Sequence, residues 1–262
     1  MSDNNGELSP TMETEMSHKS IRAYTEEEPS EETVRKIVRA GQQAPFASQL
    51  YSVLLSRDRE KQPFNAPLLF TICIDFHKLE LVMERRDWEM VSNDLHCLWF
   101  GIQDASYMAQ NMVTAAESLG MGTCFLGDAP YQARKIAQKY DLPQRVFPLV
   151  QLAMGYPDED PPTRPRYPLD FVLFEDEYPE FSEDQIERAM NTMDEGYLEQ
   201  DYYIRASAKI PLEEKEETFT YEDYSWTEHI SRKWGQWHES PETLLELLEE
   251  MGFSFELEED ST

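Results

Sequence analysis

Apolar residues recur at steps of three and four between Gly101 and Leu119, the spacing that places side chains on one face of an α-helix. Further apolar residues occupy the other faces, and only Asp104 and Glu117 carry a full charge in this stretch. The pattern therefore predicts a long helix that is buried nearly all round. The periodic positions are Ile102, Ala105, Ala109, Met112, Ala116 and Leu119, and the other faces carry Met108, Val113 and Ala115.

Two glycines, Gly120 and Gly122, are predicted to end this helix, because glycine adopts the positive φ of a helix C-cap without steric cost. The segment from Thr123 to Gly127 has the composition of a short inner strand, and its closing glycine would let the backbone approach a ligand. On spacing alone, a core helix followed by a core strand explains the whole stretch without any function.

Apolar runs predict three further strands, at residues 48–57, 67–75 and 146–156. Helical patterns predict a helix that is capped by Ser30 and stops at Pro45, and another with Asp128 as its N-cap and Pro130 in its first turn. Three more helices are expected at residues 183–203, 226–233 and 241–251, and residues 77–100 are expected to be partly helical.

The chain of 262 residues is long enough for one substantial core, and the pattern predicts one main domain over residues 17–253. Residues 1–16 are polar and lack periodicity, so they are predicted to be a disordered N-terminal tail. An acidic and aromatic block at 211–224 is predicted to be an excursion from the domain, and 254–262 an acidic C-terminal tail.

Charge excludes two classes of partner. The chain has 23 Lys and Arg against 52 Asp and Glu, and a net charge of −29 argues against binding to nucleic acid or to an anionic membrane. The acids are spread along the chain, which suits a general solubility strategy such as growth at high salt. A dedicated basic partner remains the alternative explanation.

The three cysteines, Cys73, Cys97 and Cys124, have no C-x-x-C spacing, so we expect small buried side chains in a reducing compartment rather than a disulfide framework or a zinc site. His77 and His96 have no second ligand at helical spacing, so no metal site is predicted. The chain has no apolar run near eighteen residues and a polar, acidic N-terminus, from which we expect a cytoplasmic protein.

Cations are scarce, yet Lys19 and Arg22 stand close together in a stretch that begins at Ser17. Ordinary solvent-exposed ion pairs and an anion site, in which the two cations face a phosphate and Ser20 donates its hydroxyl, are equally compatible with this stretch. A second pair, Arg164 and Arg166, lies in a proline-rich loop that stiffens the backbone and lowers the entropic cost of holding two cations.

Three motifs in this order resemble the nitroreductase superfamily of FMN-dependent oxidoreductases: HKSIRAYT from His18, LGMGTCFLG from Leu119, and LPQRVFPLVQLAMGYP followed by RPRYP. The resemblance is closest to the branch of the oxygen-insensitive NADPH nitroreductases and the NADPH–FMN reductases, in which RPRYP corresponds to the phosphate-binding loop. The segment WTEHISR from Trp226 also resembles a C-terminal helix of that branch. The resemblance covers roughly residues 17–253.

The resemblance implies an α+β sandwich, with a mixed, mostly antiparallel sheet surrounded by helices, built as an intertwined homodimer with FMN in each interface cleft. The long helix would lie at the dimer core. Carried over by position, Arg205 would bind the nicotinamide nucleotide, and the loop near the flavin would contain Ser48 and Gln49. The phosphate and ribityl chain of FMN would be held by His18, Lys19, Ser20, Arg22, Arg164 and Arg166, and the backbone beside the flavin ring would come from Phe125, Leu126 and Gly127.

The implied activity is that of an FMN-dependent NAD(P)H oxidoreductase, with ping-pong transfer through FMN N5 to a small aromatic or flavin acceptor. No acid–base pair of the protein is needed, because the chemistry belongs to the flavin. The alternatives are dehalogenation or ene-reduction on the same fold, and a flavin-binding protein without turnover. Phe46 and Pro67 depart from the family pattern and motivate the last alternative, and the acids at 211–217 would repel the 2′-phosphate of NADPH.

Overall fold

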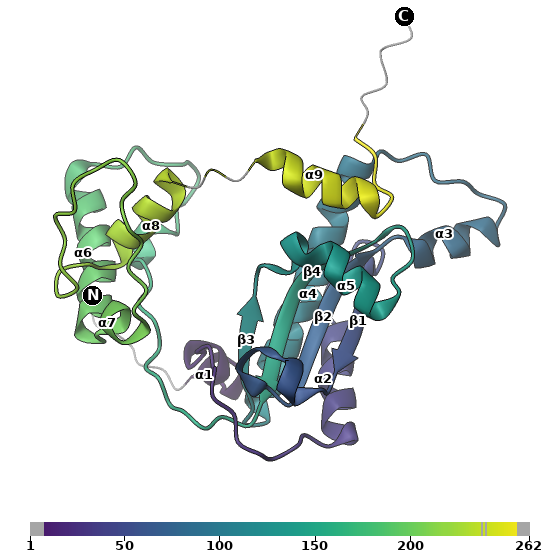
Figure 1. The fold of residues 1–262 in the computed structure, drawn as a ribbon, viewed down its shortest axis with the longest axis horizontal. Coiled ribbons are helices and arrows are strands. Elements are labelled where there is room, and N and C mark those ends of the chain that lie inside the picture. The colour runs from purple at the N-terminus through teal and green to yellow at the C-terminus, as the bar shows by residue number, and fades with distance from the viewer. Residues whose placement is uncertain (1–7, 237, 239, 256–262) are drawn as a thin grey trace, which may run out of the picture. The chain divides into compact units, whose positions relative to one another are not determined.

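The computed structural model describes residues 8–236, 238 and 240–255. Contacts divide the chain into two compact units, one formed by residues 1–161 with 240–262 and the other by residues 162–239 (Figure 1). The predicted single domain of residues 17–253 therefore spans two units. Each unit is described by itself below.

Four antiparallel strands form the sheet of the first unit, in the order β1-β2-β4-β3. The central strand β2 is buried along its whole length, as its continuous apolar run predicts. Parallel pairing occurs at an isolated bridge between Ser20 and Thr123. The strands are β1 (Tyr51–Ser56), β2 (Leu68–Asp75), β3 (Gly122–Leu126) and β4 (Val146–Gly155), which confirms the four predicted strands.

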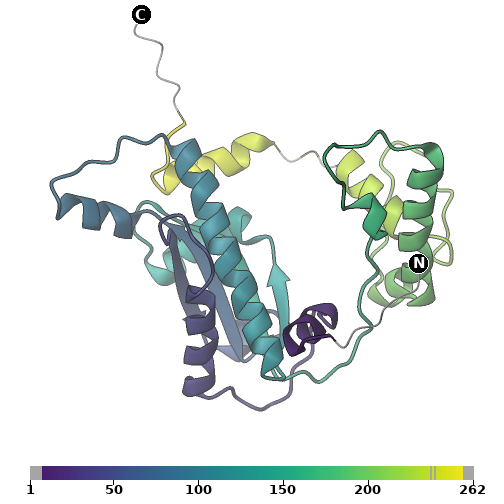
Figure 2. The ribbon, with the colours of Figure 1, turned by 180° about the vertical axis from the view of Figure 1, so that it is seen from behind.

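Two helices, α2 (Glu31–Gln42) and α4 (Asp94–Ser118), cover one face of this sheet (Figure 2). The oxygen of the Ser30 side chain accepts a hydrogen bond from the backbone N–H of Thr33 at 3.1 Å, which confirms the predicted N-cap of α2. A Cβ atom on Gly41 would lie 2.6 Å from Cγ of Met112, so the backbone of α2 packs directly against side chains of α4 there. The main core of the unit lies between these helices and the sheet.

The long helix differs from its prediction in two respects. It begins seven residues before Gly101, at Asp94, because the side chain of Asn93 caps it by accepting from His96 N at 3.0 Å. It is also not buried all round, since Ile102 is 43% exposed. It ends at the first of the two predicted glycines, since Gly120 adopts a φ of +77° directly after the C-cap, whereas Gly122 already belongs to β3.

The described part of the first unit also contains the α-helices α1 (Pro10–Met16), α3 (His77–Glu84), α5 (Ala133–Tyr140) and α9 (Pro241–Glu250). The prediction of a disordered tail up to residue 16 was wrong for α1, which is capped by Ser9 and has Pro10 in its first turn. The predicted cap at Asp128 was also wrong. Its side chain caps no helix, because a 3₁₀ turn (Ala129–Gln132) precedes α5.

The second unit contains α6 (Glu183–Glu199), α7 (Tyr202–Ala206) and α8 (Trp226–Gly235). The block 211–224 contains no helix or strand, and it is fastened by an ion pair in which Arg232 Nη1 lies 2.8 Å from Glu217 Oε2. Arg232 is buried, and the guanidinium holds the pKa of the Glu217 carboxyl well below its usual range. Of the predicted C-terminal tail at 254–262, residues 256–262 lie outside the described residues.

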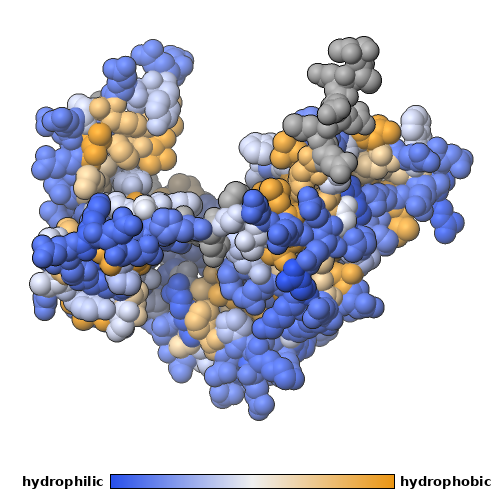
Figure 3. Space-filling view, turned by 45° about the horizontal axis from the view of Figure 1, so that its top comes forward, coloured by the Kyte–Doolittle hydropathy of each residue, from blue (hydrophilic) through white to orange (hydrophobic). Residues whose placement is uncertain are grey.

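Hydrophilic side chains cover much of the face that Figure 3 shows, and apolar residues form separate patches between them. This distribution agrees with a chain whose 52 acidic residues are spread along its whole length.

Candidate functional site

The basic stretch that begins after Ser17 lies along the start of β3. Backbone N–H of Ile21 donates to the carbonyl oxygen of Thr123 at 2.8 Å, next to the Ser20–Thr123 bridge. Gly122 makes this contact possible, because a Cβ atom there would lie 2.5 Å from Cγ1 of Ile21. The sheet therefore fixes the backbone from which the candidate phosphate ligands project.

The first two side chains of this stretch are each paired with an acid. His18 Nδ1 lies 2.7 Å from Glu117 Oε1, and that oxygen also accepts from the hydroxyl of Thr123 at 2.9 Å. The Lys19 ammonium pairs with the Asp160 carboxylate. Glu117 stands at the C-terminal end of α4 and Asp160 follows β4, so two elements of the core fold position these two side chains.

Ser20 and Arg22 meet at the thiol of Cys124 in β3. Burial raises the pKa of this thiol, and the charge of Arg22 together with a hydrogen bond to Ser20 opposes that shift. Burial also raises the pKa of Cys97, and it raises the pKa of Cys73 to about 12. The three cysteines are free, buried and neutral at pH 7, as predicted, and none is a candidate nucleophile.

The segment after β4 runs beside residues 22–25 and is hydrogen-bonded to them. Asp158 N donates to Ala23 O at 2.9 Å, and Thr25 N donates to Tyr156 O at 2.9 Å. The Glu159 carboxylate accepts from the backbone N–H groups of Arg22 and Ala23. These bonds hold the basic stretch from a second side.

Beyond the cluster, β3 presents an open edge. In an antiparallel strand, alternate residues turn their backbone polar groups toward the paired strand and away from it. Thr123 faces away from β4, because its oxygen accepts from Ile21, and Phe125 therefore turns its N–H to the same open side. Phe125 is 39% exposed, and a Cβ atom on Gly127 would have no neighbour within 4 Å.

These features fit an FMN molecule. Its phosphate requires cations and hydroxyl donors, which the stretch from His18 to Arg22 provides. Its ring requires an accessible backbone with little side-chain bulk, which the edge from Phe125 to Gly127 provides. The cluster and the edge follow one another along the same strand, in the order in which a phosphate-bearing flavin would need them.

The other predicted cations lie in the second unit. Arg164 donates to the side chain of Gln200, and its guanidinium lies 4.3 Å from the centroid of the Tyr202 ring. Arg166 is exposed and donates to the carbonyl oxygens of Arg164 and Pro165, each at 3.0 Å. Their participation in the same phosphate site stays a prediction.

Arg205, the predicted nucleotide ligand, lies in α7 and its side chain is 71% exposed. Its guanidinium is 3.6 Å from the Asp201 carboxylate, four residues earlier. An exposed pair of this kind is weak, so Arg205 is available to an anionic ligand. Its role likewise stays a prediction.

Sequence reasoning missed Asp104, the residue that shapes the loop containing Ser48 and Gln49. Asp104 is only 1% exposed, and its carboxylate accepts from three backbone N–H groups: Ala47 at 2.6 Å, Ser48 at 3.0 Å and Leu50 at 3.0 Å. Gln49 adopts a φ of +56° within this loop. The sequence did contain a signal, a lone acid on an otherwise apolar helix face. A buried charge needs hydrogen-bond partners, so such an acid indicates that polar groups of the chain lie against it.

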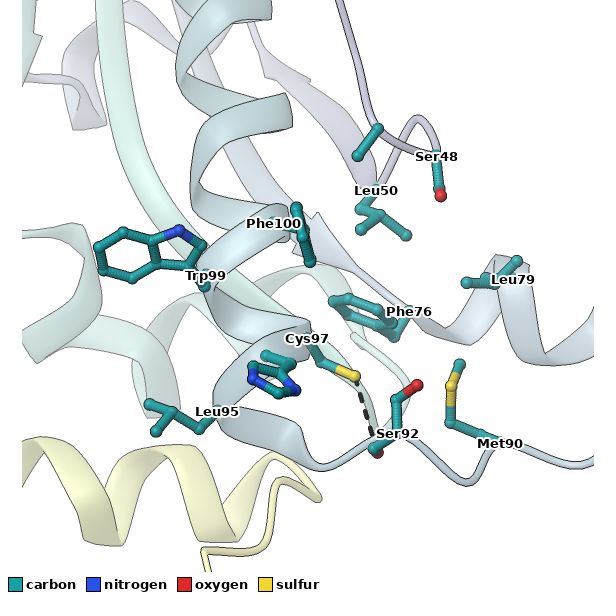
Figure 4. A pocket seen from close by; sticks show the side chains of 12 residues that line it. Ser48, Leu50, Phe76, Leu79, Met90, Ser92, Leu95, Cys97, Trp99 and Phe100 are labelled. Carbon is teal, nitrogen blue, oxygen red and sulfur yellow. Dashed lines mark hydrogen bonds between the residues drawn. The ribbon is translucent and has the colours of Figure 1, made fainter.

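A cavity of about 960 Å³ opens beside this loop (Figure 4). Most of its wall is apolar or aromatic, and no Asp, Glu, Lys or Arg belongs to the wall. Its size suits a small organic molecule. The wall consists of Ala47, Ser48, Leu50, Phe76, Leu79, Met90, Ser92, Leu95, His96, Cys97, Trp99 and Phe100.

One of the two departures from the family pattern, Pro67, has a structural explanation. Pro67 is buried and packs on Gly155, where a Cβ atom would lie 2.5 Å from Cγ of the proline. Phe46 is 51% exposed at the start of the loop that Asp104 holds. Within the described ranges, no group of three or more His, Cys, Asp or Glu side chains could hold a metal ion, and no helix is long and apolar enough to cross a membrane.

Comparison with known proteins gives matches over most of the chain. The sequence profile of the Nitroreductase family matches residues 16–62 and 55–156. A Cr(VI) reductase of Pseudomonas sp. (strain G-1) is 30% identical over 194 residues, which is 69% of this chain and 80% of that protein. The FMN reductase [NAD(P)H] of Bacillus subtilis (strain 168) is 30% identical over 194 residues, or 68% of this chain and 77% of that protein. The solved structure of B. megaterium NfrA2 superimposes with a TM-score of 0.81 at 26% identity, covering 95% of this chain and all of that one.

Proposed function

The chain belongs to the nitroreductase family and is an FMN-dependent NAD(P)H oxidoreductase, and we propose that its FMN lies along the start and the open edge of β3. The observation that carries this proposal is the position of Lys19 and Arg22. The sheet fixes their backbone beside the start of β3, and the accessible edge from Phe125 to Gly127 continues the same strand.

In this proposal the residues bind and orient, and they do not exchange protons with a substrate. Lys19 and Arg22 neutralise the phosphate, the arginine through its two-pronged guanidinium, and Ser20 donates its hydroxyl. The N–H of Phe125, on the open side of β3, would donate to the bound flavin, and Gly127 would leave room beside it. When bound, the flavin supplies the two-electron chemistry between NAD(P)H and an acceptor.

We propose that NAD(P)H and the acceptor use one site in turn, which gives ping-pong kinetics. Initial rates measured with NADPH and a quinone or nitroaromatic acceptor will give parallel lines in double-reciprocal plots. Lines that converge would mean that both substrates are bound at once, and they would contradict a single shared site. The largely apolar cavity beside Ser48 is our candidate for the acceptor, since uncharged aromatic molecules suit its wall.

The nucleotide is proposed to bind through Arg205, with Arg164 and Arg166 joining the FMN phosphate site. Acidic residues crowd the 211–217 segment, which contains Glu213, Glu214, Glu216 and Glu217. Such acids oppose a 2′-phosphate, so we expect kcat/KM for NADPH and NADH to differ by no more than about fivefold, the factor of one exposed ion pair. A preference of several hundredfold for NADPH would contradict this expectation.

We also propose a homodimer, because the N-terminal half of α4 exposes a row of large apolar side chains. Leu95 is 67% exposed, Trp99 66% and Ile102 43%, and they follow one another at helical spacing. A second copy that covers this row would stabilise the dimer by about 25 cal/mol for each Å² of apolar surface removed from water.

We further propose a cytoplasmic location. The free thiols of Cys73, Cys97 and Cys124 support it.

Replacing Trp99 by glutamate will convert the dimer into monomers, because the substitution places a charge in the proposed interface. Sedimentation velocity will show the loss of the dimer peak. Trp88→Glu is the matched control, since Trp88 is 70% exposed but lies outside α4. If both variants remained dimers, or if both became monomers to the same extent, the proposed interface would be contradicted.

A further inference from the structure

Resting on the proposed FMN site, we propose that Asp160 competes with the phosphate of FMN for Lys19 and thereby sets the affinity for the cofactor. The Asp160 carboxylate pairs with the Lys19 ammonium across 141 residues of sequence. The cation that is proposed to bind the phosphate is therefore already bound to an anion of the chain itself.

The two neighbouring acids of this loop are held in different ways. Glu159 accepts from the backbone N–H groups of Arg22 and Ala23, so it is fastened to the main chain of the basic stretch. Among the described residues, the Asp160 side chain bonds to the Lys19 side chain alone, and it is 88% exposed. Glu159 is therefore the fixed anchor of the loop, and Asp160 is the acid that can turn into water.

Electrostatics require this movement. A phosphate on Lys19 brings a dianion next to the Asp160 carboxylate, and like charges at such distances repel one another. The chain already carries a net charge of −29, so no surplus of cations relieves the repulsion. Since an exposed ion pair contributes little, Asp160 leaves at a small cost, and that cost is subtracted from the binding of FMN.

Asp160→Asn will therefore tighten the binding of FMN by about two- to fivefold, the equilibrium factor that an exposed ion pair is worth. Binding to the flavin-free full chain is measured by the quenching of FMN fluorescence. Riboflavin, which lacks the phosphate, is the second probe, and its affinity will not change. Tighter binding of riboflavin by the same factor would overturn the proposal, because the effect would then lie at the ring.

Asp158→Asn is the matched control, since it removes one negative charge from the same loop and the Asp158 side chain has no ion pair in the described structure. It will leave FMN affinity nearly unchanged. Equal gains in the Asp158 and Asp160 variants would overturn the proposal in favour of a general charge effect. In a Lys19→Gln background, the Asp160 substitution will give no gain, and a gain that persists there would also overturn it.

The proposed function and this inference fail in different ways. An unchanged chain that binds no FMN contradicts the proposed function, and with it the inference. If the unchanged chain binds FMN, but the Asp160→Asn and Asp158→Asn variants have the same FMN affinity, only the inference is contradicted.

Discussion

Replacing Lys19 and Arg22 together by glutamine will weaken the binding of FMN by at least about 100-fold while the protein remains folded. A hydrogen bond to a charged group contributes about 1.5–3 kcal/mol, and two such bonds to the phosphate would be lost. The fold will survive because Arg22 is exposed and the Lys19 side chain is 30% exposed, so neither side chain belongs to the core. Titration of the flavin-free protein with FMN, followed by flavin fluorescence, measures the change.

The control for this experiment is the double variant Arg35→Gln, Lys36→Gln. It changes the net charge by the same two units, and both side chains are exposed on α2 in ordinary ion pairs with Glu31 and Glu32. FMN affinity in the control will stay within a few fold of the original. Equal losses in the two double variants would assign the effect to overall charge and contradict the phosphate site.

The second large effect is expected at Asp104. Substitution by alanine will lower the free energy of unfolding by about 3–5 kcal/mol, because it removes a buried carboxylate that accepts from three backbone N–H groups, of which that of Leu50 is buried. Urea unfolding measures this loss. Asp104→Asn will recover part of it, since one amide oxygen can still accept.

FMN affinity provides a second measurement on the same variants. The loop that contains Ser48 and Gln49 depends on Asp104 for its shape, so flavin binding will weaken in the alanine variant even where the protein is folded. Asp158→Ala, a change at an exposed acid, will affect neither property. An Asp104→Ala protein as stable as the original would contradict the role given to this carboxylate.

The strands and most helix starts followed from sequence because their signals are local. A continuous apolar run marks β2, and a serine before two glutamates marks the start of α2. The start of α4 had an equally local signal in Asn93, which the periodic pattern from Gly101 onward obscured. The helix α1 was missed because none of its residues is buried and no apolar period marks it.

Exposure of the long helix could not be predicted from its period. A periodic apolar face looks the same in sequence whether the chain itself covers it or a second copy does. Ile102 and Leu119, predicted to be buried, are 43% and 46% exposed, whereas Met108 and Met112 are buried as expected. The difference between the two pairs is a property of the tertiary structure.

Motifs located the cations of the site, but they did not locate the acids beside them. Glu117 lies 99 residues from His18 and Asp160 lies 141 residues from Lys19, so only the folded chain brings each pair together. Similarly, the sequence marks Pro67 as a lost polar contact, whereas the structure adds that it packs on Gly155. This packing gives Pro67 a structural reason that does not depend on a loss of turnover.

The central claim is that this chain holds FMN and reduces it with a nicotinamide nucleotide. Its most direct test is an absorption spectrum of the purified protein, recorded without air before and after the addition of NADPH and, separately, NADH. We predict a bound yellow flavin that is bleached by both nucleotides. A flavin that neither nucleotide bleaches, or a protein that binds no FMN when it is added, would contradict the account.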